Sequence, residues 1–381
     1  MLAPLLEKIL PSNRFYARKV EAARSLDELF TTKQELVDDQ AAHPPYGTNL
    51  TYPLHRYTRF CQTSGTSGKP LRWIDTPESW EWMLGNWDRV YAAAGITSAD
   101  RIFFAFSFGP FLGFWTAFEA ATRMGALAIP GGGMRSLHRL QTILDLSATV
   151  LCSTPTYAIH LAEAAREERI DLSRSKIRKI VVAGEPGGSI AATRAHIESV
   201  WPGATVVDHH GMTETGPVSY GCPVRPGVLH VIESSYIAEV IDNELILTNL
   251  GRLGSPLIRY RTGDIVRASK GACACGTTDL ALEGGILGRT DDMVVVRGVN
   301  VFPSAIEEIL RGEGVSEYRV HVTTERAMTQ LRIEAESSAA SHLEAVLLSA
   351  FSLRIPVTSV PEGSLPRFEA KAKRWLRNDN S

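Results

Sequence analysis

The sequence predicts an α/β protein with a large N-terminal domain, built on mostly parallel sheets flanked by helices, and a small C-terminal α+β domain. The first observation behind this prediction is a regular alternation of strand-like and helix-like segments between residues 101 and 208, which favours parallel strands joined by helices. The second is a polar Arg/Asp stretch at residues 288–293, after which a new strand-and-helix pattern begins. A chain of 381 residues is long enough for one large and one small domain.

Composition and charge argue against several classes of protein. The hydrophobic fraction of 44% is ordinary for a globular protein, and a formal net charge of −2 provides no general basic field for nucleic acid. No run approaches the ~20 apolar residues of a membrane span, and the N-terminal residues lack the layout of a signal peptide. We therefore expect a cytoplasmic enzyme with neither a nucleic-acid nor a membrane partner.

Residues 1–60 read as helices and loops with a break at residues 43–47, and we assign them no chemistry. The next stretch gathers hydroxyl-bearing residues, glycines and a lysine, namely Thr63, Ser64, Gly65, Thr66, Ser67, Gly68 and Lys69. Glycines let the backbone approach a ligand closely, and hydroxyls, backbone N–H groups and a lysine can surround phosphate oxygens. The spacing is not that of a Walker A loop, and a flexible Ser/Gly surface loop is the alternative interpretation.

Aromatic residues dominate the following segments. Residues 78–94 have helical spacing, and residues 101–108 suit a buried strand that leads into an aromatic turn. Four phenylalanines gather near the end of this strand: Phe106, Phe108, Phe111 and Phe114. They are candidate walls for a flat apolar substrate, with core packing as the alternative for each of them.

Strands and helices then alternate, with strands expected at residues 126–130, 149–153, 179–183 and 205–208 and helices at residues 137–146, 156–168 and 190–201. Ligands of such sheets bind beyond the carboxyl ends of the strands. The loops at residues 184–188 and 209–216 both fall at such ends, and they become candidate ligand-binding loops.

Carboxylates on two turns point to nucleotide chemistry. Thr213 and Glu214 place a hydroxyl and a carboxylate in one glycine-flanked turn, which suits phosphates and Mg²⁺. Asp264 lies on a tight turn after Gly263 and suits a ribose diol. Each motif is weak when taken alone, because a Gly-Asp turn is usually only a turn.

Together and in this order, these segments resemble the adenylate-forming superfamily of acyl-CoA synthetases, adenylation domains and luciferases, over nearly all of residues 60–375. Residues 289–303, which end in Arg-Gly-Val-Asn-Val-Phe-Pro, are most similar to the phenylacetate–CoA ligase branch. The resemblance implies a large ATP- and acyl-binding domain at residues 1–288, a hinge at residues 289–291 and a small mobile domain at residues 292–381.

The resemblance also implies a role for individual positions. Residues 63–69 match the phosphate loop, and Thr213 and Glu214 match positions that handle phosphate and Mg²⁺. Two loops match nucleotide-binding positions, one with Gly184, Glu185 and Pro186 and the other with His210, Gly211 and Met212. The remaining matches are Asp264 to the ribose-binding aspartate, Arg289 to an arginine near the ribose and phosphates, Asp291 to the hinge, and Lys371 to the lysine that reaches the α-phosphate during adenylation.

Two departures from the family pattern bear on these roles. Ala370 precedes Lys371 where the family usually has glycine, and a second lysine, Lys373, lies nearby. His210 stands where an aromatic residue often stacks on adenine, and a histidine can stack as well. Read alone, the basic segment at residues 363–374 would be a solvated tail.

Cysteine and histidine spacing adds a candidate metal site. Cys273 and Cys275 form a tight pair in a glycine-bounded loop, with Cys222 and His230 upstream, and together they would complete a tetrahedral structural Zn²⁺ site. Some proteins resembling phenylacetate–CoA ligase carry cysteines and a histidine at matching places. Free buried thiols are the alternative, and the odd count of five cysteines does not indicate a disulfide framework. Cys61 and Cys152 are expected to be core residues.

The leading hypothesis is ATP-dependent adenylation of an aromatic (aryl or arylacetic) carboxylic acid and its transfer to coenzyme A by an AMP-forming acid–thiol ligase. The expected ligands are ATP, Mg²⁺, coenzyme A, a small carboxylic acid and a structural Zn²⁺, and a homodimer is one assembly to consider. A second hypothesis keeps adenylation but transfers the acyl group to an amine, a hydroxyl or a carrier-protein thiol. A third is a nucleotide-binding protein without catalysis, which Ala370 alone supports.

Overall fold

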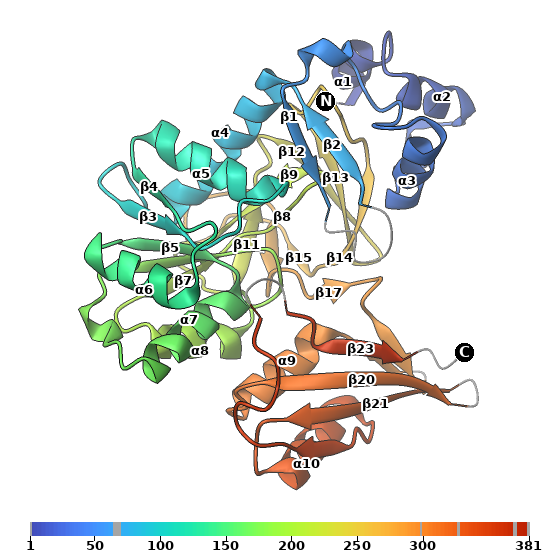
Figure 1. Ribbon diagram of the computed structural model, residues 1–381. Coiled ribbons are helices and arrows are strands. Elements are labelled where there is room, and N and C mark those ends of the chain that lie inside the picture. The colour runs from blue at the N-terminus through green and yellow to red at the C-terminus, as the bar shows by residue number, and fades with distance from the viewer. Residues whose placement is uncertain (1, 64–69, 298, 326–327, 369–371, 379–381) are drawn as a thin grey trace.

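A computed structural model describes residues 2–63, 70–297, 299–325, 328–368 and 372–378 (Figure 1). At the centre of the larger, N-terminal part lies a five-stranded sheet with the order β4-β3-β5-β6-β7, in which all neighbouring strands are parallel. Its strands are β3 (Arg101–Phe104), β4 (Leu127–Pro130), β5 (Val150–Ser153), β6 (Lys179–Val182) and β7 (Thr205–Asp208). The predicted parallel sheet is therefore confirmed.

Helices cover both faces of this sheet: α4 (Pro77–Ala93) and α5 (Leu112–Met124) on one, and α6 (Ser136–Asp145), α7 (Pro155–Glu167) and α8 (Ala191–Val200) on the other (Figure 1). Successive strand residues point to opposite faces, so Phe104 packs into the first core and Phe103 into the second. α4 and α7 each begin with a threonine N-cap followed by proline, which satisfies exposed N–H groups and presets the helical backbone.

The first strand of this sheet is shorter than predicted. β3 ends at Phe104, whereas the apolar run continues to Phe108. Phe108 has φ 51°, in the left-handed region that a β-strand excludes, so the chain turns away from the sheet there. Residues 105–111 therefore form a loop at the carboxyl edge of the sheet, next to the candidate ligand-binding loops.

Antiparallel strands, which the sequence did not predict, build most of residues 211–289. One sheet has the order β10-β11-β16-β15 and a second the order β12-β13-β14-β17. The strands are β10 (Ser219–Gly221), β11 (Val228–Val231), β12 (Tyr236–Ile241), β13 (Glu244–Asn249), β14 (Tyr260–Ile265), β15 (Ala268–Ser269), β16 (Ala281–Glu283) and β17 (Gly288–Arg289). Two hairpins complete this part, β1 (Arg59–Gln62) with β2 (Arg72–Asp75) and β8 (Gly211–Met212) with β9 (Gly216–Pro217).

The N-terminal region packs against these antiparallel strands. It contains α1 (Leu2–Ile9), α2 (Arg14–Ala22) and α3 (Lys33–Ala42), and the short 3₁₀ helices η1 (Leu26–Glu28) and η2 (Leu54–Arg56); a third, η3 (Leu172–Arg174), follows α7. A shared core joins Tyr16 and Leu29 to Tyr260. Thr31 forms a parallel bridge with Tyr260, so the segment before α3 extends the edge of β14.

The C-terminal part, drawn in orange and red in Figure 1, has a core of its own. The hairpin β18 (Val294–Val296) and β19 (Val299–Val301) leads into α9 (Pro303–Gly312). A mixed sheet follows, with the order β22-β21-β20-β23, and α10 (Ala340–Phe351) packs with it. Its strands are β20 (Tyr318–Glu325), β21 (Met328–Ala335), β22 (Val357–Ser359) and β23 (Trp375–Asn378). The predicted α+β character of this part is confirmed, and α9 lies against α8 of the larger part.

Within the described ranges, no helix combines the length and the apolar character needed to cross a membrane.

Candidate active site

The turn that carries Thr213 and Glu214 is held by a fully buried arginine. This turn connects β8 to β9, and Arg252 donates from Nη1 to the carbonyl oxygens of Thr213 at 2.7 Å and Glu214 at 2.9 Å. The Nε and Nη2 atoms of Arg252 each lie 2.6 Å from one carboxylate oxygen of Asp75, and both side chains are completely buried. Paired, bidentate geometry is the condition under which a buried ion pair is tolerated.

Asp75 ends β2, the second strand of the hairpin that carries the candidate phosphate loop. Thr63 closes the described end of this hairpin: its N–H donates to the carbonyl of Leu71 at 3.0 Å, and its hydroxyl accepts from the N–H of Leu71 at 3.0 Å. Ser64, Gly65, Thr66, Ser67, Gly68 and Lys69 lie outside the described residues. The Asp75–Arg252 pair thus ties the base of the phosphate-loop hairpin to the Thr213–Glu214 turn.

A lysine from the N-terminal region also reaches this turn. Glu214 is buried, and its Oε1 lies 3.4 Å from the ammonium nitrogen of Lys33, at the start of α3. The bridge between Thr31 and Tyr260 places Lys33 there, because Thr31 exchanges backbone hydrogen bonds with Arg259 and Arg261. Lys33 lies in a region to which the sequence analysis assigned no chemistry.

Asp264 is the centre of a second polar group. Its Oδ2 lies 2.9 Å from Nε2 of His210, and its Oδ1 accepts from Nη1 of Arg289 at 2.9 Å across the β14–β17 pairing. Arg289 also donates to both carboxylate oxygens of Asp291, at 2.8 and 3.1 Å. Asp264 is buried, and its two side-chain neighbours come from segments 54 and 25 positions away along the chain.

The ion pairs set the charge states in this group. Burial disfavours the cation of Arg289, but the hydrogen bonds to Asp291 and the charge of Asp264 outweigh it and raise the Arg289 pKa. Burial likewise opposes ionisation of Asp291, and the hydrogen bonds and charge of Arg289 lower its pKa overall. Asp292 behaves oppositely, since burial and the nearby Asp291 charge raise its pKa. Arg289 therefore presents a permanent cation between two carboxylates.

Glu185, in the loop after β6, is a hydrogen-bond acceptor for two backbone N–H groups. Its Oε1 accepts from Thr156 at 2.9 Å and its Oε2 from Ala372 at 2.8 Å. Gly184 has φ 93° and begins the turn that holds Glu185 and Pro186 outside the strand. Lys371 itself lies outside the described residues. Arg374, near the end of the basic segment, is not solvated, because it is buried and pairs with Glu317.

The phenylalanines take separate positions near the carboxyl edge of the parallel sheet. Phe106 is buried in the core shared with α4 and α5, and Phe108 packs edge-on against Trp115 and Phe118. Phe111 precedes α5 and is partly exposed, and the side chain of Phe114 lies outside the described set. For Phe106 the structure shows the packing role that the sequence analysis kept as the alternative.

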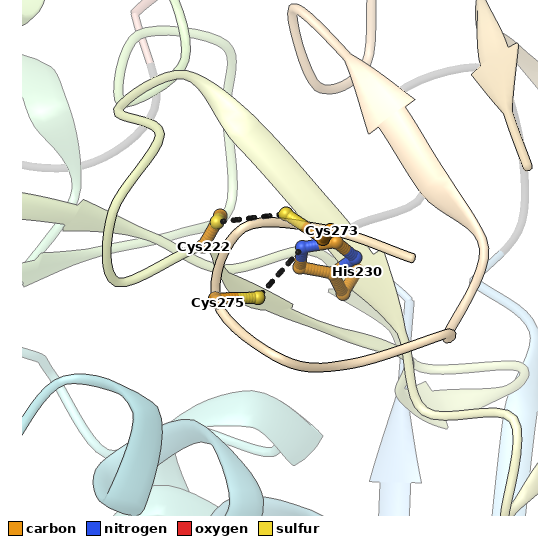
Figure 2. Close-up of side chains that lie close together, drawn as sticks. All are labelled: Cys222, His230, Cys273 and Cys275. Carbon is orange, nitrogen blue, oxygen red and sulfur yellow. Dashed lines mark hydrogen bonds between the residues drawn. The ribbon is translucent and has the colours of Figure 1, made fainter. Parts of the chain in front are cut away.

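The four predicted metal ligands come together from three segments (Figure 2). Cys222 follows β10, His230 lies on β11, and Cys273 and Cys275 lie in the loop between β15 and β16. Their ligand atoms all lie within 4.8 Å of one another. The other two cysteines, Cys61 and Cys152, are buried in the core, as expected.

Two of the ligand separations match those of a tetrahedral zinc site. Two thiolates about 2.3 Å from one tetrahedral ion lie about 3.8 Å apart, and a thiolate and an imidazole nitrogen about 3.5 Å. The sulfur atoms of Cys222 and Cys273 lie 3.7 Å apart, and Sγ of Cys275 lies 3.6 Å from Nε2 of His230. Nδ1 of His230 lies 3.1 Å from the carbonyl of Asp279, which orients the ring and leaves Nε2 for an ion.

The comparisons with known proteins agree with this geometry. Residues 25–240 match the family described as AMP-binding enzyme, and residues 298–378 match the AMP-binding enzyme C-terminal domain. The chain belongs to the AMP-binding enzyme family.

Several relatives of this AMP-binding enzyme are CoA ligases, which confirms the predicted superfamily and the class of AMP-forming acid–thiol ligases. The phenylacetate–coenzyme A ligase of Escherichia coli (strain K12) is 30% identical, over 95% of this chain and 90% of its own length. That of Thermus thermophilus is also 30% identical, over 85% of this chain and 77% of its own length.

Solved structures of one ligase also resemble the AMP-binding enzyme described here. A 2-hydroxyisobutyryl-CoA ligase in the postadenylation state, in complex with R3-HIB-AMP, is 27% identical, covers 99% of this chain and 88% of its own, and superimposes with a TM-score of 0.91. The same ligase in the thioesterification state, with 2-HIB-AMP and CoA, gives a TM-score of 0.73 at 28% identity, with coverage of 98% and 87%.

Proposed function

We propose that the protein activates an aromatic carboxylic acid with ATP and transfers the acyl group to coenzyme A. The observation that carries this proposal is the pair of polar groups described above, centred on Glu214 and Asp264. Glu214 pairs with Lys33, and the Asp75–Arg252 ion pair ties the Glu214 turn to the hairpin of the candidate phosphate loop. Asp264 lies between His210 and Arg289. A triphosphate with its metal ion needs a carboxylate such as Glu214, and the adjoining ribose needs an acceptor such as Asp264.

Each residue has a proposed part in nucleotide binding. The Asp264 carboxylate accepts hydrogen bonds from the ribose hydroxyls, and Arg289 neutralises nearby phosphate charge. Residues 63–69, which precede Leu71 and β2, surround the phosphates. His210 keeps Asp264 oriented, and the loop from Gly184 to Pro186 lies beside the base and the acyl group.

In the first half-reaction, a carboxylate oxygen of the acid attacks the α-phosphorus of ATP and pyrophosphate leaves, giving an acyl-adenylate. Both reactants are anions, so a cation and fixed N–H donors must stabilise the added charge. Lys371 is the proposed cation. In the second half-reaction, the coenzyme A thiolate attacks the acyl carbonyl and AMP leaves, after the small domain has rotated about Asp291 and withdrawn Lys371.

The Thr213–Glu214 turn fits a magnesium ion chemically. Mg²⁺ prefers carboxylate and phosphate oxygens, and Glu214 offers a buried carboxylate whose only close cation among the described residues is Lys33, at 3.4 Å. When bound, Mg²⁺ would neutralise charge on the departing pyrophosphate. Arg252 holds the backbone of this turn through the carbonyl oxygens of Thr213 and Glu214.

We further propose that Cys222, His230, Cys273 and Cys275 hold a structural Zn²⁺. Four protein ligands leave no open position for substrate. The ion would attach the loop of residues 270–280 to β10 and β11, beside the small apolar cluster of Cys222, Val228 and Ala281. Backbone N–H donation from Cys275 is the main cause that lowers the pKa of Cys273 to about 6, whereas burial raises the pKa of Cys222 to about 11. Cys273 is therefore the thiol of this pair that ionises first.

An aromatic acid is the substrate class that the local composition supports best. Phe108 is partly exposed in the loop at the carboxyl edge of the sheet and packs edge-on against Trp115, and Phe111 follows it. Relatives named phenylacetate–coenzyme A ligases support the same class. The 2-hydroxyisobutyryl-CoA ligase shows that a similar fold also serves an aliphatic acid, so aliphatic acids belong in the test.

The test is incubation with ATP, Mg²⁺ and a panel of benzoic, aminobenzoic, hydroxybenzoic, phenylacetic and short aliphatic acids, with and without coenzyme A. Pyrophosphate release and product mass are measured together. We expect an acyl-CoA from an aryl acid. An adenylate without a thioester would favour a different acceptor, and no pyrophosphate from any acid would contradict the proposed function.

A further inference from the structure

Three side-chain hydrogen bonds between described residues join the segments 365–368 and 372–374 to the larger part of the protein. Nε of Arg367 donates to Oε2 of Glu163 at 3.0 Å, and the N–H of Ala372 donates to Oε2 of Glu185 at 2.8 Å. Nη1 of Arg374 lies 3.4 Å from the hydroxyl of Thr156.

The acceptors of these contacts lie along one side of α7. Thr156 is in the first turn of the helix, and Glu163 is seven residues later, two turns along the same face. Glu185 joins them because its other carboxylate oxygen accepts from the N–H of Thr156 at 2.9 Å. Its negative charge at the N-terminus of α7 is favourable. The face of α7 defined by Thr156 and Glu163, with Glu185, is therefore a docking site for Arg367, Ala372 and Arg374.

Arg367 can lose its contact with this site and still keep a carboxylate partner. It holds both carboxylate oxygens of Glu336, at 2.9 and 2.8 Å, and the side chain of Glu336 is completely buried. To Glu163 it makes a single hydrogen bond at a partly exposed position. When the Glu163 bond breaks, Arg367 keeps its bidentate partner in the small C-terminal part, so no buried charge is left without a partner.

Glu185, in the larger part of the protein, likewise keeps a hydrogen-bond partner when the two parts separate. If Ala372 moves away, Oε1 of Glu185 still caps the first turn of α7. Both halves of the docking site thus remain ordered when they separate. Such contacts suit reversible docking better than permanent packing, which would bury apolar side chains.

We propose that Glu163 and Glu185 are positioning residues that hold the segment around Lys371 against the large domain for adenylation and release it before thioester formation. This rests on the proposed function. Lys371 precedes Ala372 directly, and Arg367 and Arg374 lie four residues before it and three after it, so the contacts flank it on both sides. The arrangement that contains them superimposes with a TM-score of 0.91 on a postadenylation state and 0.73 on the thioesterification state of the same ligase.

The first test measures the two half-reactions separately in Glu163→Gln, Glu185→Gln and the double variant. Loss of one charge-assisted hydrogen bond is expected to slow pyrophosphate release roughly tenfold. In Glu163→Gln, thioester formation from a synthetic acyl-adenylate and coenzyme A should be as fast as in the wild type or faster, since release becomes easier. A merely structural defect would slow both half-reactions, and that result would overturn the proposal.

A matched control comes from the same interface. Arg166 and Glu362 also join the two parts, at 3.2 Å, but their side chains are 71% and 66% exposed. Arg166→Ala removes an interdomain ion pair without touching the docking site, and we expect both half-reactions to stay within about twofold of the wild type.

The second test needs no substrate. In Glu163→Gln, hydrogen–deuterium exchange should rise in peptides covering residues 365–374, while exchange at the start of α7 is unchanged. In Glu185→Gln, exchange should rise in both regions. Unchanged exchange in the double variant would overturn the proposal. If the wild type releases no pyrophosphate with any acid, the proposed function fails, and the exchange data alone still decide whether these carboxylates hold the segment.

Discussion

His210 and Asp264, 54 residues apart in the chain, are joined by a contact of 2.9 Å between Nε2 and Oδ2. Since a carboxylate accepts hydrogen bonds, Nε2 of His210 is the donor and Oδ2 of Asp264 the acceptor. Nδ1 is buried without a hydrogen-bond partner among the residues that the structure describes. His210 therefore orients the carboxylate proposed to bind ribose.

This contact distinguishes hydrogen bonding from stacking on adenine. His210→Phe keeps an aromatic ring but removes the donor to Asp264. We expect the KM for ATP to rise about tenfold in His210→Phe and by a similar factor in His210→Ala, because both leave a buried carboxylate short of one donor. Steady-state kinetics with varied ATP check this. A normal KM in His210→Phe would show that the ring, and not the hydrogen bond, is what matters.

Lys371→Ala should abolish adenylation while transfer from a preformed acyl-adenylate continues. Removing the cation proposed to stabilise the transition state is expected to cost about 10²–10³-fold in the rate of pyrophosphate release. Lys373→Ala is the matched control: its side chain is exposed, and we expect a change below about twofold. Normal adenylation by the Lys371 variant would contradict the assignment, and loss of adenylation in the Lys373 variant would move it there.

The cysteine cluster predicts one zinc ion per chain by elemental analysis. Cys273→Ser should lose the metal and lower the melting temperature, because the loop of residues 270–280 loses its attachment to β10 and β11. Cys152→Ala, which removes a thiol from the apolar core, should keep the metal even where it lowers stability. If the purified protein contains no zinc, and still contains none after refolding with added Zn²⁺, the four residues are free thiols and an unligated histidine, and the prediction is wrong.

The Glu336–Arg367 pair predicts a loss of stability in acid. Burial opposes ionisation of Glu336, but hydrogen bonds from Arg367 and from backbone N–H groups outweigh it and lower its pKa from 4.5 to about 2. A carboxyl group with a depressed pKa stabilises the folded state fully above its unfolded value and loses that contribution as the pH falls toward the folded value. The difference in free energy of unfolding between wild type and Glu336→Gln should therefore shrink between pH 6 and pH 3.

Urea unfolding at the two pH values measures this difference. Glu362→Gln, at an exposed position, serves as the control and should match the wild type at both values. A difference that stays constant from pH 6 to pH 3 would mean that the ion pair does not determine the acid response.

Arg252→Met tests the link between the phosphate-loop hairpin and the Thr213–Glu214 turn. Breaking a buried ion pair leaves Asp75 charged and unpaired, at a cost of about 3–5 kcal/mol in free energy of unfolding. Adding Asp75→Asn should recover part of this loss. Arg123→Met, whose partners Glu81 and Asp88 have side chains 63% and 50% exposed, should cost less than about 1 kcal/mol. Equal losses in the two single variants would contradict a special role for Arg252.

Local patterns predicted the parts of the protein that are continuous in sequence. The apolar strands and amphipathic helices from residue 126 to residue 208 lie where the pattern places them, within about two residues. The antiparallel strands between residues 216 and 289 were not recognised, because several have only two or three residues and lack a clear alternation. The aromatic run after Phe104 was assigned too long a strand, since periodicity does not reveal a backbone turn such as that at Phe108.

The candidate site was predicted where motifs carry it and missed where tertiary contacts do. Glu214 and Asp264 lie on turns with distinctive residues, and Cys222, His230, Cys273 and Cys275 have a recognisable composition. Lys33 and Arg252 have no local signal: one is an ordinary lysine at a helix start and the other an arginine in a loop. Only the fold shows that the first meets Glu214 and the second meets Asp75.

The bridge between Thr31 and Tyr260 also dictates an order of assembly. The segment that brings Lys33 to Glu214 is synthesised early, yet its partner strand is added more than two hundred residues later. During translation, the N-terminal helices must therefore wait, unattached to β14, while the parallel sheet beside them is completed. A truncation that removes β14 would leave this early segment with its apolar face uncovered, and such a fragment would be prone to aggregate.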